Sequence, residues 1–229
     1  MNIHQRTKML LGEERFAALA KARVAIFGLG GVGGTAAEAL ARSGIGHLSL
    51  VDFDVVDPSN LNRQILFTAK DVAKKKTEAA AEKLLSINSE IEIATIAEMV
   101  DDKFFEKRDF EGFDYLIDAV DDVDAKLAIA QYAIQKKIPF ISCLGMANRI
   151  DPSKVSVKAL AETSNDPLAK KIRSVFRHHG IDLGRVQVVS SSEVPLFRGS
   201  TPSSMMMVPS EAGLLIDSVV ILYLANRKR

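Results

Sequence analysis

Residues 23–34 read Arg-Val-Ala-Ile-Phe-Gly-Leu-Gly-Gly-Val-Gly-Gly, an apolar run that meets a cluster of glycines. Small residues from Thr35 to Ala41 continue at helical spacing, so the stretch predicts a strand, a tight turn and a helix. Glycine suits such a turn because its backbone is permissive and lets a phosphate approach closely. The start of the helix would direct free N–H groups and its positive dipole end at that phosphate. The candidate nucleotide-binding glycines are Gly28, Gly30, Gly31 and Gly33.

A second apolar run over 48–51 leads to Asp52, about 20 residues beyond the turn, where a carboxylate can accept hydrogen bonds from a ribose. The pattern up to this point indicates a nucleotide and is typical of proteins that bind a dinucleotide such as NAD. A tight turn without any ligand would produce the same pattern. The polar residues that follow Asp52 are therefore needed to choose between these interpretations.

The loop over 52–64 reads Asp-Phe-Asp-Val-Val-Asp-Pro-Ser-Asn-Leu-Asn-Arg-Gln. A loop that directly follows a strand lies on the ligand side of an open α/β sheet. Arg63 suits a triphosphate because its planar guanidinium can donate several hydrogen bonds at once, and a nicotinamide enzyme needs no arginine there. Asp54 could position a metal ion or orient Arg63. The alternative interpretation is a solvated polar loop.

Strands and helices alternate through the rest of the first 150 residues. Helical spacing over 70–88 predicts an amphipathic helix with Lys74, Lys75 and Lys76 mostly outward. The alternation predicts an α/β fold: a Rossmann-like, doubly wound, mostly parallel sheet with helices on both faces. The later elements are a strand over 90–96, a short helix over 102–107, a strand from 115 towards 122, a helix over 124–136 and a strand over 139–143.

Acidic residues follow the fourth expected strand, beside the ligand crevice. Asp118, Asp121 and Asp122 stand at its end, and a carboxylate there can hold Mg2+ through its oxygens. Asp122 also suits the cap of the helix that follows, better than Asp121 does. Asp121 is therefore the candidate metal ligand.

The pattern changes beyond residue 150, which predicts a C-terminal α+β extension over 151–229. Its expected elements are a strand near 155–159, a basic helix over 166–177, a strand over 185–190, a loop over 196–208 and an apolar helix over 211–226. His178 and His179 are interpreted as capping or surface residues. If the basic residues of this half share a face, they could attract an RNA backbone. They are Lys170, Lys171, Arg173, Arg177, Arg185 and Arg198.

Composition bounds these interpretations. The 229 residues fit one domain, and a net charge of +1 gives no bulk electrostatic argument for nucleic acid. The single cysteine, Cys143, excludes an intramolecular disulfide and a CxxC zinc site within one chain, and its place on an expected strand favours a core thiol over a nucleophile. The polar N-terminus and a 13-residue apolar stretch interrupted by Asp217 favour a cytoplasmic protein without a membrane span.

Five motifs together resemble the ThiF/MoeB family, the bacterial relatives of ubiquitin-activating enzymes. They are Gly-Leu-Gly-Gly-Val-Gly, Val-Asp-Phe-Asp, Ser-Asn-Leu-Asn-Arg-Gln, Lys76 and the Asp-Ala-Val-Asp of 118–121, and the resemblance spans 6–150. Members adenylate a carboxylate with ATP and Mg2+. The resemblance implies one adenylating domain over 1–229, with a nucleotide-binding core at 1–150 and a substrate-binding part with a closing helix at 151–229.

The resemblance also implies roles for individual residues. Gly31 would lie against the phosphates and Asp52 would hold the ribose. Asn60, Arg63 and Lys76 would bind the triphosphate, with Gln64 and Asp54 beside them in the cofactor-binding loop. Asp121 would lie at the metal and phosphates, so the candidate catalytic residues are Arg63, Lys76 and Asp121. Arg6 resembles an arginine that reaches the partner's ATP in dimeric relatives, which implies a homodimer.

A subgroup of the family, the dehydratases that act on threonylcarbamoyladenosine in tRNA, is more similar still. The similarity rests on Arg6-Thr7, the Glu-Ala-Leu-Ala-Arg-Ser-Gly-Ile-Gly of 38–46, the Asp-Pro-Leu-Ala of 166–169 and the Val-Pro-x-x-Ala-Gly-Leu of 208–214. It implies tRNA carrying threonylcarbamoyladenosine as the substrate. Two alternatives remain open: adenylation of the C-terminal Gly-Gly of a ubiquitin-like sulfur-carrier protein, which the missing CxxC pairs disfavour, and an NAD-binding oxidoreductase or sensor.

Overall fold

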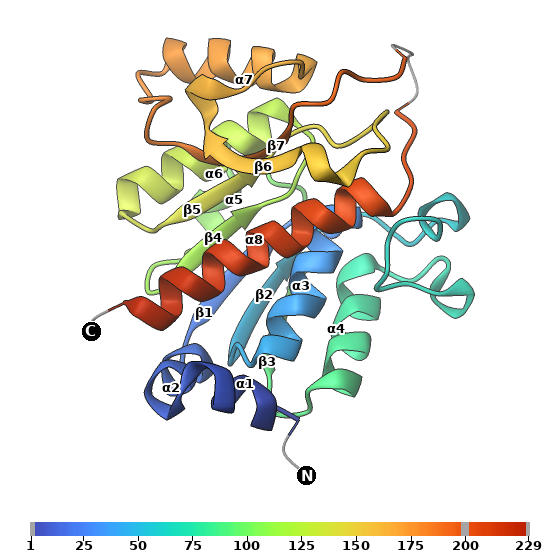
Figure 1. Ribbon diagram of the computed structural model, residues 1–229, viewed down its shortest axis with the longest axis vertical. Helices are drawn as coiled ribbons and strands as arrows, with labels where there is room; N and C mark the ends of the chain where they lie inside the picture. Colours follow the sequence, from blue (N-terminus) through green and yellow to red (C-terminus); the bar gives the residue numbers. More distant parts are fainter. Residues whose placement is uncertain (1–2, 198–201, 228–229) are drawn as a thin grey trace.

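Over residues 3–197 and 202–227, which the computed structural model describes, a seven-stranded sheet runs through the centre of the molecule (Figure 1). Its strand order is β3-β2-β1-β4-β5-β7-β6, and neighbours are parallel except for the antiparallel pair β6 and β7. The strands are β1 (Arg23–Phe27), β2 (His47–Val51), β3 (Glu92–Ile96), β4 (Tyr115–Asp118), β5 (Phe140–Cys143), β6 (Val155–Ala159) and β7 (Gln187–Ser191). The expected mostly parallel sheet is confirmed.

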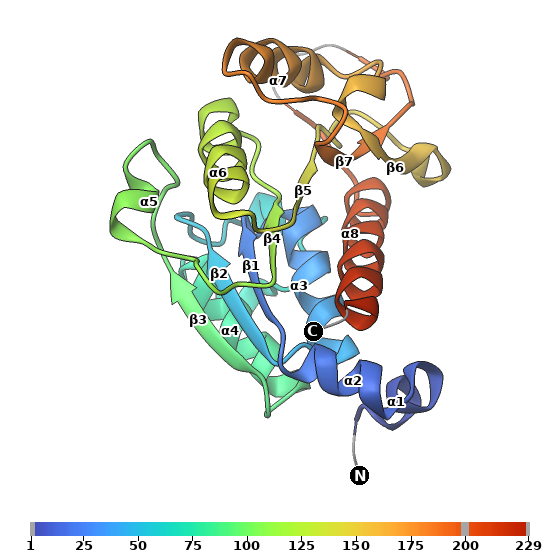
Figure 2. The same cartoon turned by 90° about the vertical axis from the view of Figure 1, so that its left-hand side faces the viewer.

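Helices cover both faces of the sheet, as a doubly wound fold requires (Figure 2). One face packs against α3, α4 and α8, and the other packs against α5 and α6, with α7 beside α6. The helices are α1 (Gln5–Leu11), α2 (Glu13–Ala20), α3 (Gly31–Ser43), α4 (Lys76–Ile87), α5 (Phe104–Lys107), α6 (Val123–Lys136), α7 (Pro167–His178) and α8 (Met207–Asn226).

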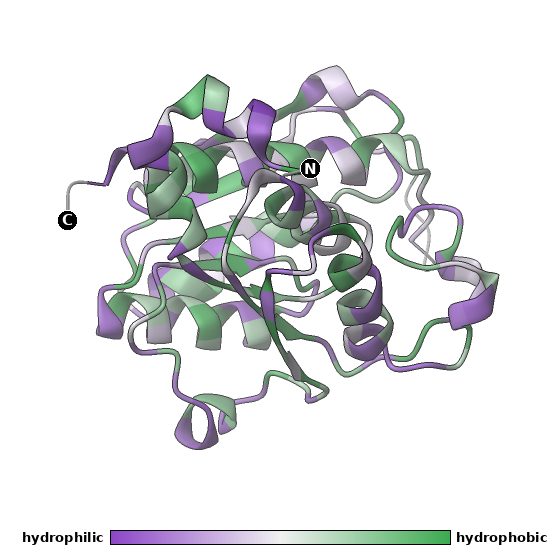
Figure 3. Cartoon of the chain, turned by 90° about the horizontal axis from the view of Figure 1, so that it is seen from below, coloured by the Kyte–Doolittle hydropathy of each residue, from purple (hydrophilic) through white to green (hydrophobic). Residues whose placement is uncertain are grey.

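The central strands are apolar along their length because both of their faces are covered. In β1, Val24, Ala25, Ile26 and Phe27 are all fully buried. Figure 3 shows apolar residues gathered in the strands at the centre of the molecule. This packing fixes the carboxyl ends of β1, β2 and β4 next to one another, and the candidate site residues follow those ends.

The close approach of α8 to α3 depends on Gly213. A Cβ at this position would lie 2.6 Å from the backbone oxygen of Val32, so any larger residue would push the helices apart. The same packing brings Pro209, near the start of α8, against Gly31 at the start of α3. The C-terminal helix therefore reaches the glycine turn.

The helix expected over 70–88 begins only at Lys76, and this boundary and the outward position of Lys76 were predicted wrongly. Residues 69–71 form a short 3-10 turn, η2 (Ala69–Asp71), and Ala73 has a positive φ of 70°. Backbone hydrogen bonds join Val56 to Ala73 and Lys74, so the segment is tied to the polar loop instead of continuing the helix. As a result Lys76 is 5% exposed.

Helix α8 begins at Met207, four residues before the expected start. Pro209 lies within the first turn of a helix, where its missing N–H has no intrahelical partner to lose. The helix has 20 residues, so by length and composition alone it could cross a membrane, which the shorter apolar stretch did not suggest. This signal is weak, since buried helices of soluble proteins share it, and α8 packs along α3.

Candidate nucleotide-binding site

The glycine turn between β1 and α3 has no room for side chains at two positions. A Cβ at Gly33 would lie 1.9 Å from the backbone oxygen of Gly28. Gly28 has a φ of 89°, and a Cβ there would lie 2.7 Å from the oxygen of Ala119. The turn is therefore held by backbone contacts against the segment that follows β4.

The start of α3 has no side-chain cap, whereas α6 and α7 are capped by the carboxylates of Asp122 and Asp166. Gly30 occupies the N-cap position of α3, and a Cβ there would meet nothing within 4 Å. The first N–H groups of a helix need an acceptor, and an anion supplies one that the dipole favours. The turn thus combines open space with unsatisfied donors, which fits a phosphate group.

Asp52 connects the end of β2 to this turn. Its carboxylate accepts hydrogen bonds from the backbone N–H groups of Leu29 at 2.6 Å and Asp54 at 2.8 Å. Burial raises the pKa of the Asp52 carboxyl, and the charge of Lys76 and the Leu29 N–H group act in the opposite direction. Each carboxylate oxygen has a second lone pair, so the residue can still accept from a ribose hydroxyl.

Lys76 and Asp54 form an ion pair beside Asp52, with 2.7 Å between Nζ and Oδ2. Lys76 is almost buried, whereas the Asp54 side chain is 46% exposed. An ammonium group has three donors and this contact uses one of them, so the remaining donors can bind a phosphate. Asp54 is thus paired with Lys76, and its expected role in positioning a metal ion or orienting Arg63 stays a prediction.

The polar loop carries Asn60, Arg63 and Gln64 to the start of α3. The Arg63 side chain passes beside Gly31, where a Cβ would lie 3.5 Å from Arg63 Cγ. Arg63 donates from Nη1 to the oxygen of Ser59 and to Asn62 Oδ1, both at 3.0 Å, so a ligand can be bound through Nη2 and Nε. Asn60 Oδ1 accepts from the Asp57 N–H within η1 (Pro58–Asn60).

Gln64 differs from its neighbours because it is 4% exposed and its Oε1 has no hydrogen-bond partner in the described structure. Buried polar atoms are usually paired, so an orphaned oxygen indicates a partner that binds later.

Asp121 lies in the turn between β4 and α6, and its side chain is exposed. The two residues before Asp121, Ala119 and Val120, pack on the glycine turn, since a Cβ at Gly28 would meet both of them. Asp122 accepts from the Ala125 N–H at 2.8 Å, which confirms its capping role. The carboxyl ends of β1, β2 and β4 therefore bring together the glycine turn and four side chains. These are Asp52, Arg63, Lys76 and Asp121.

Arg6 is not part of this group within one chain. It is exposed on α1, and His4, two residues before it, contacts the backbone oxygen of Arg42 at the far end of α3. A 13-residue helix is about 20 Å long, so α3 separates Arg6 from the glycine turn. Figure 1 shows α1 and α2 at the bottom of the molecule, where β1 begins. Arg6 could reach a nucleotide only in another copy of the chain.

The C-terminal segment, residues 151–229, differs in charge from residues 1–150. Residues 151–229 contain eleven basic and seven acidic residues, whereas residues 1–150 contain nineteen basic and twenty-two acidic ones. On α7, which has no acidic residue, Lys170, Lys171 and Arg177 are exposed. Arg173 instead donates to the oxygen of Thr163 at 3.0 Å. Arg185 is paired with Asp182, and Arg198 lies outside the described residues.

His178 and His179 are exposed at the end of α7, as expected for surface or capping residues. Cys143 is 3% exposed, and burial raises the pKa of its thiol to about 12. A buried thiol with this pKa is not a nucleophile at neutral pH, which confirms the interpretation of Cys143 as a core residue.

Two buried cations were missed by the sequence analysis. Lys126 in α6 is 0% exposed, and Arg149 is 3% exposed and donates to backbone oxygens of Gly145, Ala147, Asn165 and Glu193. Lys126 has a signal in the sequence: Ile129, Ala130 and Ala133, at helical spacing from it, are at most 1% exposed. A lysine on that face needs a buried partner. The sequence gives no comparable signal for Arg149. Its acceptors are backbone oxygens, which every residue has, so no particular side chain marks them.

An uncapped helix start after a glycine turn, with an acidic residue ending the next strand, defines a nucleotide-binding α/β protein. The ThiF family model matches residues 4–164, about 70% of the chain, and the chain belongs to the ThiF family.

Three relatives illustrate the similarity. A tRNA threonylcarbamoyladenosine dehydratase of Bacillus subtilis (strain 168) is 35% identical over 240 residues, which cover 96% of this chain and 94% of that protein. The crystal structure of the Escherichia coli enzyme of that name in complex with ATP has a TM-score of 0.90 and 34% identity, covering 96% of this chain and 92% of that one. A molybdopterin-synthase adenylyltransferase of Salmonella typhimurium is 34% identical over 72% of this chain and 64% of that protein.

Proposed function

We propose that this protein uses ATP to adenylate the threonyl carboxylate of threonylcarbamoyladenosine in tRNA, so that the group can close into a ring with net loss of water. The observation that carries this proposal is the uncapped start of α3, which faces the Arg63 loop and the Asp121 turn. The relatives support the choice of nucleotide and substrate, since the dehydratases match this chain almost from end to end.

The first step is the attack of the carboxylate oxygen on the α-phosphorus of ATP. A bond forms between that oxygen and phosphorus, the bond to the β-phosphate oxygen breaks, and pyrophosphate leaves. Such a step depends on positioning and on neutralising charge more than on acid–base groups. Arg63 and Lys76 supply positive charge, and Asn60 and Gln64 supply polar contacts. Asp52 holds the ribose, and the glycine turn from Gly28 to Gly33 binds the phosphates.

Asp121 fits the role of a ligand to Mg2+. Among the described residues, no group of three or more His, Cys, Asp or Glu side chains is arranged to hold a metal ion. Mg2+ is usually bound by one or two carboxylates together with substrate phosphates, so a single exposed carboxylate beside the phosphate site is sufficient. Bound there, the ion would neutralise charge on the phosphates. Asp54 lies beside Lys76 and orients that ammonium group.

The second step is intramolecular. A nitrogen of the threonylcarbamoyl group attacks the activated carbonyl, its proton is released, and AMP leaves with the carboxylate oxygen. No enzyme nucleophile is required, and the buried thiol of Cys143 agrees with this requirement.

The remaining roles divide along the chain. We assign the nucleotide-binding core to 1–150 and the substrate-binding part with the closing helix to 151–229. The exposed cations of α7 would bind the tRNA backbone.

Helix α8 exposes Leu214, Leu222 and Tyr223, and this apolar surface would pack against a second copy in a homodimer that brings Arg6 to the partner's ATP. We assign the protein to the cytoplasm and interpret α8 as a packed helix, not as a membrane span, because it lies along α3.

The test is to incubate the protein with MgATP and tRNA that carries the uncyclised nucleoside, and to measure pyrophosphate release and the nucleoside mass. The proposal predicts pyrophosphate release that depends on the modified tRNA, with loss of one water from the nucleoside. Unmodified tRNA is the control. Release without tRNA, or an unchanged nucleoside mass, would contradict the proposal.

The second candidate is adenylation of the C-terminal Gly-Gly of a ubiquitin-like sulfur carrier. It is favoured by two relatives: a molybdopterin-synthase adenylyltransferase, 34% identical over 72% of this chain, and a sulfur carrier protein ThiS adenylyltransferase, 35% identical over 56% of it. It predicts exchange of pyrophosphate into ATP in the presence of the carrier and in the absence of tRNA. An NAD-dependent activity is disfavoured because these relatives are adenylating enzymes, and it would require NAD to stabilise the fold while MgATP does not.

A further inference from the structure

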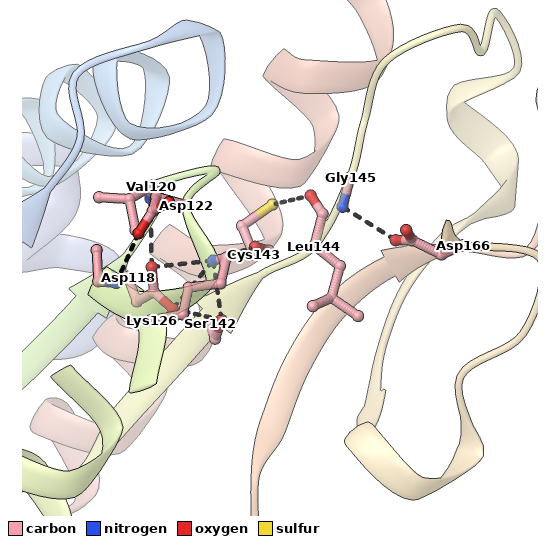
Figure 4. A network of polar contacts seen from close by, with 10 residues as sticks. Asp118, Val120, Asp122, Lys126, Ser142, Cys143, Leu144, Gly145 and Asp166 are labelled. Atoms are coloured by element: carbon pink, nitrogen blue, oxygen red, sulfur yellow. Dashed lines mark hydrogen bonds and ion pairs between the residues drawn. The ribbon is translucent and has the colours of Figure 1, made fainter. Parts of the chain in front are cut away.

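Lys126 is the most completely buried charged residue near the proposed site. Its Nζ donates to both carboxylate oxygens of Asp118 at 2.9 and 3.0 Å, to Ser142 Oγ at 3.1 Å and to the backbone oxygen of Cys143 at 2.7 Å (Figure 4). Lys126 is 0% exposed and Asp118 is 1% exposed. The contact joins α6 to the carboxyl ends of β4 and β5, immediately behind the turn that carries Asp121.

Contacts on two sides fix the position of the turn between β4 and α6. On the inner side, Asp118 Oδ1 accepts from the Val120 N–H at 3.2 Å, and Ser142 Oγ donates to Asp118 Oδ2 at 2.5 Å. On the outer side, Ala119 and Val120 pack against Gly28. The Asp122 cap fixes the end of the turn at α6. Asp121 is the exposed carboxylate between these fixed points.

The burial of this pair is difficult to explain by stability alone. Moving an ammonium and a carboxylate out of water carries a large desolvation cost for each ion, and apolar residues of similar volume often stabilise a core equally well. Here the ammonium group has acceptors from two adjacent strands, β4 and β5, and β4 ends at the proposed phosphate site. Groups behind a metal ligand typically orient it, and changing them lowers metal affinity by about 10–100-fold.

The geometry points to Lys126 as a positioning residue: together with Asp118, it fixes the β4–α6 turn so that the Asp121 carboxylate faces the nucleotide phosphates. This inference rests on the proposed function, because it assigns Asp121 to the metal and phosphates. Lys126 itself touches neither the nucleotide nor the reacting atoms.

The test compares ATP affinity with and without Mg2+, measured by isothermal titration calorimetry, for Lys126→Met, Asp121→Asn and the combined variant. Lys126→Met should reduce the gain in ATP affinity on adding Mg2+ by about 10-fold or more, and leave the affinity for metal-free ATP within about 2-fold. The combined variant should match Asp121→Asn, because the lysine acts only through that carboxylate. Lys136→Met is the matched control on α6, since Lys136 is paired with Glu111 at the surface and should change neither affinity.

The outcomes separate this inference from the proposed function. If Asp121→Asn leaves the effect of Mg2+ unchanged, the assignment of Asp121 in the proposed function is wrong. If Asp121→Asn removes that effect but Lys126→Met keeps it, or if the two changes add independently, Lys126 is not a positioning residue. If Lys126→Met does not fold, the variant with both Asp118→Asn and Lys126→Met removes the charges together at similar volume, and it should show the same selective loss.

Discussion

The glycine-turn end of the sheet and the outer face of α7 both carry candidate functional residues, but they are built differently. At the glycine turn, backbone atoms approach so closely that a Cβ at Gly33 would lie 1.9 Å from an oxygen, and the cation Lys76 is almost buried. On α7, Lys170, Lys171 and Arg177 are exposed, on a helix without acidic residues. The backbone of the first region defines one binding geometry, whereas the second region presents exposed positive charge without a defined geometry.

This difference indicates how the two substrates would be recognised. A small, constant ligand such as ATP can be bound by fixed backbone donors, which lose little entropy on binding. The backbone of a large RNA is bound mainly through counterion release, which needs charge but little exact geometry. Substitutions in the two regions should therefore have separate effects on ATP and on tRNA.

The largest effect is expected for Gly33→Ala. Its Cβ would overlap the Gly28 oxygen, so the turn must move, at a cost of about 1–3 kcal/mol or more and with loss of ATP binding. Gly30→Ala is the matched control for stability alone, because no atom lies within 4 Å of its Cβ and its φ is −71°, whereas the added methyl group would enter the open space assigned to the phosphates. Urea denaturation and ATP titration measure both effects. Equal stability of the two variants would contradict the packing described for the turn.

The next largest effect is expected for Arg63→Ala, on the rate of adenylation. The side chain is partly exposed and bound to Ser59 and Asn62, so the free energy of unfolding should change little. Adenylation should slow by about 100–1,000-fold, the usual cost of losing one group that stabilises developing charge. Pyrophosphate release under saturating tRNA measures this rate. Normal turnover with Arg63→Ala would show that the loop does not bind the triphosphate.

Sequence reasoning predicted the backbone-defined region better than the rest. The glycines, Asp52 and the loop to Gln64 are contiguous motifs, and the structure places them together because β1 and β2 are adjacent parallel strands. The buried state of Lys76 could not be predicted, since it follows from a turn at Ala73 that delays the start of the expected helix to Lys76. The Asp118–Lys126 pair was missed because the residues occupy different elements and only packing brings them together.

A smaller effect, confined to the other region, is expected for the triple substitution of Lys170, Lys171 and Arg177 by Ala. The affinity for tRNA should fall, and the slope of log K against log salt should become less steep by about 0.7–0.9 for each phosphate that the variant no longer neutralises. ATP affinity should stay unchanged because α7 lies away from the glycine turn (Figure 1). Filter binding of tRNA at several salt concentrations measures the slope. An unchanged slope would place the RNA elsewhere on the protein.

The smallest effect is expected for Asp217→Asn on α8, the helix that reaches the glycine turn. Burial raises the pKa of the Asp217 carboxyl to about 7 from an ordinary value of 3.8. Between these pH values the unfolded chain has lost the proton and the folded chain retains it, so Asp217 lowers stability as the pH rises from 4 to 7.

The asparagine variant should therefore be more stable than the parent protein at pH 8, and the difference should vanish near pH 4. A gain of about 1 kcal/mol is expected, below the full linkage value, because the side chain is partly exposed to water. Urea denaturation at both pH values measures it. A gain that is equal at both pH values would contradict the buried state of the carboxyl.

The most direct test of the account is a crystal structure of the protein with MgATP bound. We expect the phosphates at the start of α3, with Arg63 and Lys76 donating to them, Asp52 on the ribose and Gln64 Oε1 paired. If the phosphates bind elsewhere while Arg63 stays on Ser59 and Lys76 binds only Asp54, the central claim of a triphosphate site at the glycine turn is contradicted.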